Sequence, residues 1–294
     1  MSNLLKNSEF AGGTYQPKGE MSLVLPNDWI VGCLDKGVSL SYDKPGVTKL
    51  GTFNKLGPRA RPNMTECLKP EILVITAVPP YLDPPRIDGT GNAVTMFKLY
   101  GTMAGWLAQV VPVIPGKTYR VRARAHAWAR DTADPNDAHF SHAIGKGAYY
   151  AEEGTAGLND SQINFRFRVG IDPFGATNPH GGAVVWGKGG HIYNVFHDVP
   201  PVEAVARAES ICVFLYVDNL WGLVNSNSFW AHPVLEEAVV PPPPPPPSSS
   251  GRWTITLAMT GTVTLEAGVP MIEFGKPEIK LVEVGPLPSS KTDG

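Results

Sequence analysis

The most regular pattern in the chain is an alternation of two kinds of side chain between Lys117 and Arg130. One side of this segment is apolar, and it consists of Tyr119, Val121, Ala123, Ala125, Ala127 and Ala129. The other side is basic and aromatic, and it consists of Arg120, Arg122, Arg124, His126, Trp128 and Arg130. A period of two residues is typical of a β-strand. The pattern therefore predicts a long strand with one face in a core and the other face directed outward.

Two further segments predict strands of the same kind. Between Asn164 and Ile171, Arg166 and Arg168 point outward and alternate with inward apolar residues, which are Phe165, Phe167, Val169 and Ile171. The run from Ser210 to Val217 is almost entirely apolar, which predicts a strand covered on both faces. Cys212 lies in this run and is expected to be a small core residue.

Shorter runs and turn residues complete the picture of the large part of the chain. Glu71–Thr76 and Ala93–Tyr100 predict shorter strands, and Val202–Ala208 could form a short helix. The sequence holds 31 glycines and 29 prolines, and pairs such as Asp88-Gly89 separate the predicted strands. Many short strands between Gly/Pro turns, without long helices, predict an all-β sandwich.

A tract of seven prolines, Pro241–Pro247, divides the chain into residues 1–240 and 251–294, with a Ser-rich linker through residue 250. Polyproline is stiff and extended, so the tract is expected to act as a spacer of about 20 Å. Beyond it, residues 253–257 and 262–266 predict a hairpin that turns at Met259-Thr260-Gly261, and residues 278–284 predict a third strand. So short a set of strands cannot enclose a core. We therefore expect an assembly segment that docks on another surface through Trp253, Ile255 and Leu257.

Composition narrows the classes of partner. The net charge is −2 and charged residues make up 18% of the chain, which argues against nucleic-acid binding. No apolar run approaches the roughly 18 residues of a membrane helix, so membrane insertion is not expected. The first residues, Met1–Glu9, lack the pattern of a secretory signal. Three cysteines without a CxxC spacing leave a bridge between Cys33 and Cys67 open.

Three stretches together resemble jelly-roll carbohydrate-binding modules. They are Asn3–Gly13 followed by Pro26–Trp29, Gly105–Tyr119 with Gln109 before a Pro-Gly turn, and Ile211–Tyr216 with Asn227–Leu235. The resemblance spans about residues 3–237. It implies two packed antiparallel sheets, often with sugars bound on a concave face or at loop tips, and it makes Gln109 a candidate ligand residue.

The resemblance also bears on calcium. Such modules often hold a structural calcium with an acidic residue after the early Phe and an Asp pair that enters the last strand. Here those positions are Ala11 and Ala231-His232, so the site does not carry over. No cofactor is expected, although the oxygen-rich loop Asp131–Asp137 leaves calcium binding elsewhere open.

The outward residues of the two arginine-rich strands form the candidate binding face. Arginine and tryptophan would suit an anionic glycan, because aromatic rings stack on sugars and guanidinium groups bind paired oxygens. The same residue types are also common in protein interfaces, so an assembly contact is the alternative. The candidate residues are Arg122, Arg124, His126, Trp128, Arg166, Arg168 and Gln109.

No catalytic motif is present: GxSxG, HExxH and GxxxxGK[ST] do not occur. His139 and His142 give only a weak metal spacing. We therefore expect a non-catalytic structural or adhesion protein of a large assembly, such as a phage virion surface component, located on a virion or an extracellular surface. Its partners would be copies of itself, other assembly subunits or glycans. The alternative is a glycan-binding module of an extracellular carbohydrate-active enzyme system.

Overall fold

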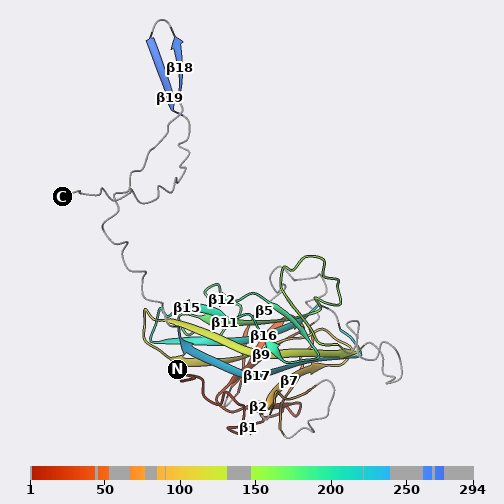
Figure 1. The fold of residues 1–294 in the computed structure, drawn as a ribbon. Coiled ribbons are helices and arrows are strands. Elements are labelled where there is room, and N and C mark those ends of the chain that lie inside the picture. Colours follow the sequence, from red (N-terminus) through yellow and green to blue (C-terminus); the bar gives the residue numbers. More distant parts are fainter. Residues whose placement is uncertain are drawn as a thin grey trace, which may run out of the picture. The chain divides into compact units, whose positions relative to one another are not determined.

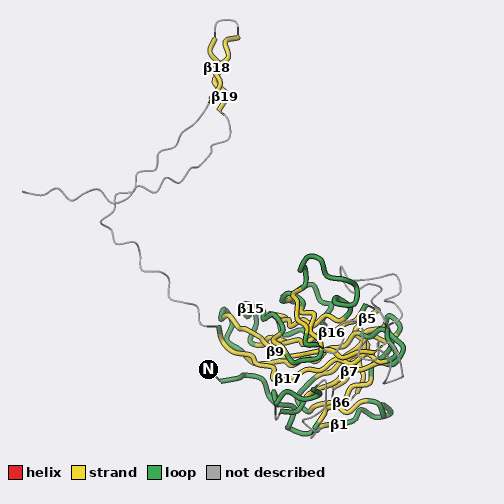
Figure 2. The backbone as a smooth tube through the Cα atoms, turned by 45° about the vertical axis from the view of Figure 1, so that its right-hand side comes forward, coloured by secondary structure: helices red, strands yellow, loops and turns green. Residues whose placement is uncertain are grey.

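The computed structural model describes residues 2–43, 46–52, 67–76, 85–89, 91–130, 147–220, 222–238, 261–266 and 269–274. These residues form strands, turns and loops, and none of them is helical (Figure 2). This part of the chain accordingly offers no helix that could cross a membrane. Contacts between Cα atoms divide the chain into two compact units, Met1–Val239 and Val240–Gly294.

In the first unit a continuous curled sheet of 17 strands folds into two layers (Figure 1). The first, which we call the β9 layer, is ordered β9, β17, β7, β6, β2, β1, with β14 and β15 on the other edge of β9. Its strands are β1 (Thr14–Tyr15), β2 (Leu23–Pro26), β6 (Glu71–Ile75), β7 (Ala93–Lys98), β9 (Thr118–Arg130), β14 (His197–Asp198), β15 (Val202–Val205) and β17 (Asn225–Glu237).

The second layer, which we call the β16 layer, is ordered β12, β11, β16, β8, β3, β4, β5. Its strands are β3 (Ile30–Asp35), β4 (Val38–Asp43), β5 (Gly46–Thr52), β8 (Ala104–Pro112), β11 (Phe165–Asp172), β12 (Val185–Trp186) and β16 (Ser210–Asn219). Strand β13 (Gly190–Tyr193) pairs with both β9 and β11 and so joins the layers, and β10 (Tyr149–Glu152) extends it.

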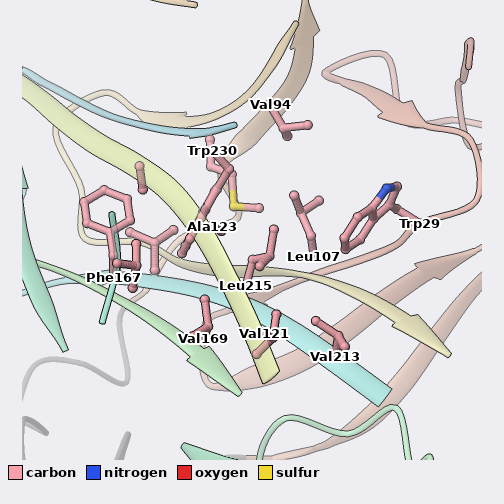
Figure 3. Close-up of a cluster of buried hydrophobic side chains, with 14 of the residues drawn as sticks. Trp29, Val94, Leu107, Val121, Ala123, Phe167, Val169, Val213, Leu215 and Trp230 are labelled. Atoms are coloured by element: carbon pink, nitrogen blue, oxygen red, sulfur yellow. The ribbon is translucent and has the colours of Figure 1, made fainter. Parts of the chain in front are cut away.

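One large hydrophobic cluster fills the space between the layers. The inner face of β9 supplies mostly alanines, which leave room for larger side chains from the neighbouring strands. Phe167 and Trp230 occupy this room and meet edge to face, with ring centroids 5.3 Å apart (Figure 3). The residues predicted to be buried are all at most 3% exposed, and they are Tyr119, Val121, Phe165, Phe167, Val169 and Phe214. The predicted all-β jelly-roll sandwich is confirmed.

Strand β16 is covered on both faces, as its continuous apolar run predicted. Its odd-numbered residues from Ile211 to Val217 face the main core. Cys212, Phe214 and Tyr216 face a second buried cluster on the outer side of the β16 layer. Cys33, Cys67 and Cys212 are all buried and free, so Cys33 and Cys67 do not pair in the structure.

One local prediction in this unit is wrong: Val202–Ala208 does not begin with a helix. Its first part is strand β15, which pairs with the edge of β9. Val202 and Ala204 turn inward while Glu203 and Val205 are exposed, so the alternation of a strand prevails over the helix propensity of alanine and glutamate.

In the second unit the structure describes a hairpin of β18 (Gly261–Glu266) and β19 (Val269–Phe274). Strand β18 matches the predicted strand at 262–266, and it pairs with β19, a strand that was not predicted, while Met259 and Thr260 of the predicted turn lie outside the described residues. Pro270 within β19 weakens the strand signal of that segment. Several predictions fall on residues that the structure does not describe. They concern the polyproline tract, the strand at 278–284, the loop Asp131–Asp137, His139 with His142, and the assembly residues Trp253, Ile255 and Leu257.

Candidate functional site

The β9 and β11 side chains predicted to form one binding face lie on the outer sides of two different layers. The outward residues of β9 are on the outer side of the β9 layer, whereas Arg166 and Arg168 of β11 are on the outer side of the β16 layer. The inner residues of β9 and β11 share one core, so their outward residues point in opposite directions. The prediction of a single face is therefore wrong.

Gln109 has a structural role rather than the predicted ligand role. Its Oε1 accepts a hydrogen bond from the Lys6 amide at 2.7 Å, and its Nε2 donates to the carbonyls of Lys6 and Asp28 at 2.9 and 3.0 Å. The residue is 5% exposed. The amide group thus ties the N-terminal segment to β8, and both its oxygen and its nitrogen are hydrogen-bonded to the backbone.

Arg166 is buried, which contradicts the prediction that it faces solvent. Its Nη1 lies 2.8 Å from Glu153 Oε1 and its Nη2 lies 2.7 Å from Asp218 Oδ2. Burial opposes the charge, but the two carboxylates outweigh it and raise the pKa of Arg166. The cation thus holds β10, β11 and β16 together instead of meeting a ligand.

Arg168 is partly exposed and packs over the Trp186 ring, with 5.2 Å between its guanidinium carbon and the ring centroid. Its Nε donates to the Gly187 carbonyl at 3.1 Å. Burial, and next the charge of Arg166, lower the pKa of Arg168. The cation–π contact fixes strand β12 on the sheet.

On the outer side of the β9 layer, Arg122 and Arg124 are paired with carboxylates. Arg122 Nε lies 3.8 Å from Glu236 Oε1. Arg124 binds the carboxylate of Asp88 and donates to the Phe196 carbonyl at 2.7 Å. These contacts make the predicted basic face close to neutral along most of β9.

His126 is fully buried although it points away from the core, so the prediction that it is exposed is wrong. Pro85, the first described residue of the segment 85–89, covers it, because its carbonyl oxygen lies 2.6 Å from His126 Nε2. The imidazole ring stacks on Phe229 and meets Phe196 edge to face, at centroid distances of 4.7 and 4.6 Å. Burial lowers the pKa of His126 to about 4, against the opposing effect of its bonds to the Ala127 and Pro85 carbonyls.

An ion-pair cluster surrounds His232, one of the positions that the sequence resemblance compared with a calcium site. His232 sits at a register shift of β17 with a φ of 47°. Its Nδ1 lies 2.8 Å from Glu9 Oε2, and its Nε2 lies 3.1 Å from the Asp88 carbonyl oxygen. Calcium prefers six to eight oxygen ligands, and an imidazole between the two acids does not fit that preference. The described part of the chain holds no group of three His, Cys, Asp or Glu residues placed to bind a metal.

A partly exposed row of side chains, which we call the outer row, lies on the outer side of the β9 layer, next to the part of this side where His126 is covered. It consists of Trp128, Asn227, Phe97 and Glu71, one from each of β9, β17, β7 and β6. Asn227 is directly opposite both Trp128 and Phe97, and Phe97 is directly opposite Glu71. Directly opposite residues share a face, and strands are about 4.8 Å apart. The row therefore spans about 14 Å, with the two aromatic residues about 10 Å apart.

The neighbouring row shows why the outer row is distinctive. On β9, β17 and β7, the next residues that point to the same side are His126, Phe229 and Thr95, and all three are buried. In the outer row, Asn227 is oriented by a 2.6 Å bond from its Nδ2 to Asn225 Oδ1. The result is a rigid strip in which aromatic rings alternate with an amide and a carboxylate.

Of the outer row, Trp128 alone was a candidate from the sequence. Asn227, Phe97 and Glu71 come from strands that are far apart in the chain, and their partnership depends on strand pairing and register. Asn227 was noted only within a stretch of family resemblance. The sequence of β7 carries a weak signal for the outward position of Phe97, because Thr95 and Phe97 alternate with Val94 and Met96.

Comparison with known proteins gives remote similarities. No protein-family model and no curated protein matches the sequence. Among solved structures, the chain is similar to the carbohydrate-binding module TmCBM61 in complex with β-1,4-galactotriose, at 14% identity and a TM-score of 0.40, covering 81% of this chain and all of that one. It is also similar to a CBM4 module, at 11% identity and a TM-score of 0.29 over 50% of this chain and 84% of that one.

A third similarity is to the enzymatically active domain of tailspike protein 4 of bacteriophage CBA120, at 9% identity and a TM-score of 0.34, over 80% of this chain and 21% of that one. Carbohydrate-binding modules are the class to which the sequence resemblance pointed. With every TM-score below 0.5, the function has to be inferred from the residues of this chain.

Proposed function

We propose that this chain is a non-catalytic glycan-binding β-sandwich and that the outer row is its binding surface. The observation that carries the proposal is the alternation of Trp128, Asn227, Phe97 and Glu71 across four hydrogen-bonded strands. Aromatic rings pack against the C–H faces of pyranoses, and amide and carboxylate groups bind sugar hydroxyls.

The placement of the row suits a chain-like ligand. The four side chains stand on strands rather than loops, so their spacing is fixed by the sheet before any ligand binds. One strand spacing is close to the length of one sugar ring, which lets successive rings meet aromatic and polar groups in turn. The row is partly exposed and lies on a sheet face, so an internal segment of a glycan could lie across it.

The same row favours binding over hydrolysis. Glycoside hydrolysis ordinarily uses two carboxyl groups that flank the scissile bond. The outer row contributes one carboxylate, Glu71, at its end. We therefore propose that the sugar chain is held and released unchanged.

Affinity electrophoresis and calorimetry against a panel of soluble polysaccharides test this function. Trp128→Ala and Phe97→Leu should each weaken binding at least about fivefold, because each removes a stacking surface worth about 1 kcal/mol or more. Phe174→Ala is the matched control, since Phe174 is 59% exposed and lies in the turn after β11, a strand of the other layer. A wild-type protein that binds no polysaccharide, or row variants that bind like the control, would refute the proposal.

A second candidate role is that of a surface or adhesion component in a larger assembly, such as a virion, working outside the cell. The hairpin β18–β19 supports it. The described strands of the second unit pair with each other, and a two-stranded hairpin by itself is marginally stable at best in water, so a partner surface on another subunit would stabilise it. Removing this segment tests the assembly role without altering the sandwich.

A further inference from the structure

The charges along the outer side of β9 differ from what the arginine-rich sequence suggests. Each arginine of β9 whose side chain is described faces an acid: Arg120 lies 3.7 Å from Glu203, Arg122 lies 3.8 Å from Glu236, and Arg124 binds Asp88. Arg124 also has Asp198 at 3.8 Å. These cations are occupied by partners within the protein.

Carboxylates outnumber the arginines among the described side chains of this face. Six acids, which are Glu9, Glu71, Asp88, Asp198, Glu203 and Glu236, stand against four arginines, which are Arg86, Arg120, Arg122 and Arg124. His232 is held between Glu9 and Asp88 and adds a charge only when it is protonated. Of the lysines nearby, Lys69 pairs with Glu20 at 2.5 Å, and Lys98 donates a hydrogen bond to the Lys69 carbonyl and keeps its charge.

We infer that the outer row selects neutral glycans and that Glu71 is the residue that excludes acidic ones. This inference rests on the proposed function and replaces the anionic glycan expected from the sequence. A sugar chain that lies across the four strands brings its last ring beside the Glu71 carboxylate. A neutral sugar can donate hydroxyl hydrogen bonds to that carboxylate, whereas a uronic or sulfated sugar places a like charge there.

The test compares neutral and uronic-acid oligosaccharides of equal length, with binding measured by calorimetry at low and at physiological salt. Wild type should bind the neutral ligand and discriminate against the acidic one. Glu71→Gln should raise the affinity for the acidic ligand about threefold to tenfold at low ionic strength, with a smaller gain at higher salt. Asp43→Asn is the control, because it makes the same change in net charge at an exposed site on β4 of the other layer.

The outcomes separate the inference from the proposed function. A wild type that prefers the acidic ligand, or a Glu71→Gln variant whose selectivity equals that of Asp43→Asn, overturns the inference and leaves glycan binding standing. A wild type that binds neither class refutes the glycan function, and the inference falls with it. Because Glu71 lies at a partly exposed strand end, melting curves of both variants should match that of wild type within a few degrees.

Discussion

Mild acid should destabilise this protein through two histidines, of which His126 is fully buried and His180 is partly buried. His126 lies under Pro85, and His180 packs edge-on against Trp106 and Tyr216 at centroid distances of 5.4 and 6.5 Å. Burial lowers the pKa of each to about 4, against an ordinary value near 6.5. Both rings are thus neutral in the folded protein at pH 5, while the same histidines in the unfolded chain are mostly protonated.

The sign and size of the effect follow from this difference in proton binding. Above pH 6.5 both histidines are neutral in both states, and the stability is fully present. As the pH falls toward 4, the unfolded state takes up protons that the folded state refuses, so the free energy of unfolding decreases. For each histidine, the free energy of unfolding falls by about 1.4 kcal/mol per pH unit in this window, which is about 3 kcal/mol per histidine over the whole window. Domain stabilities are roughly 5–15 kcal/mol, so the two histidines together decide much of the acid sensitivity.

Urea unfolding at pH 7.0, 6.0 and 5.0 measures the slope. His126→Gln keeps an N–H donor for the Pro85 carbonyl but cannot titrate, and it should remove about half of the loss between pH 6 and pH 5. His180→Gln should act alike, and His197→Gln, a change at an exposed histidine, reports on the loss of a histidine as such. A free energy of unfolding that stays level from pH 6.5 to 5 in wild type, or an unchanged slope in His126→Gln, would show that burial does not hold these rings neutral.

Two further predictions concern the core and the second unit. Phe167→Ala should lower the free energy of unfolding by about 3–5 kcal/mol in denaturant melts, because the fully buried ring fills the space beside the β9 alanines. The exposed control Phe174→Ala should lower it by under about 0.5 kcal/mol, and similar losses for the two variants would contradict the described core. Truncation after Val240 should leave a folded sandwich with a smaller oligomeric state by light scattering, and an unchanged oligomeric state would rule out the assembly role.

Local patterns predicted the strands well, because alternation reports directly on which face of a strand is buried. Strands β9, β11 and β16 follow their predicted bounds within two residues, and their inner residues are those that the alternation named. The secondary structure of Val202–Ala208 was harder to predict, because its composition suits a helix, and its first part becomes a strand by pairing with the edge of β9. The β18–β19 hairpin shows the same dependence on the partner, because β18 was expected to pair with the segment before it.

The candidate site was predicted less well, because it depends on which strands become neighbours. The sequence shows that Arg166 alternates with phenylalanines, but not that Asp218 stands opposite it on β16 and that Glu153 reaches it from the turn after β10. Likewise, Gln109 was singled out by resemblance, and its three backbone bonds reach residues about 80 and 100 positions away. Alternation says which way a side chain points and leaves open what lies over it.

The fate of the β9 arginines shows how this limit affects function. The outward residues Arg120, Arg122 and Arg124 predict a basic surface, and such a surface would favour anionic ligands. In the folded chain, Glu236 of β17 and Asp88 of the segment over His126 neutralise Arg122 and Arg124. The same segment buries His126 and leaves Trp128 as the partly exposed aromatic residue of the strand. The arginines thus act by fixing the segments that frame the outer row, and ligand selection passes to Trp128, Asn227, Phe97 and Glu71, which those segments leave accessible.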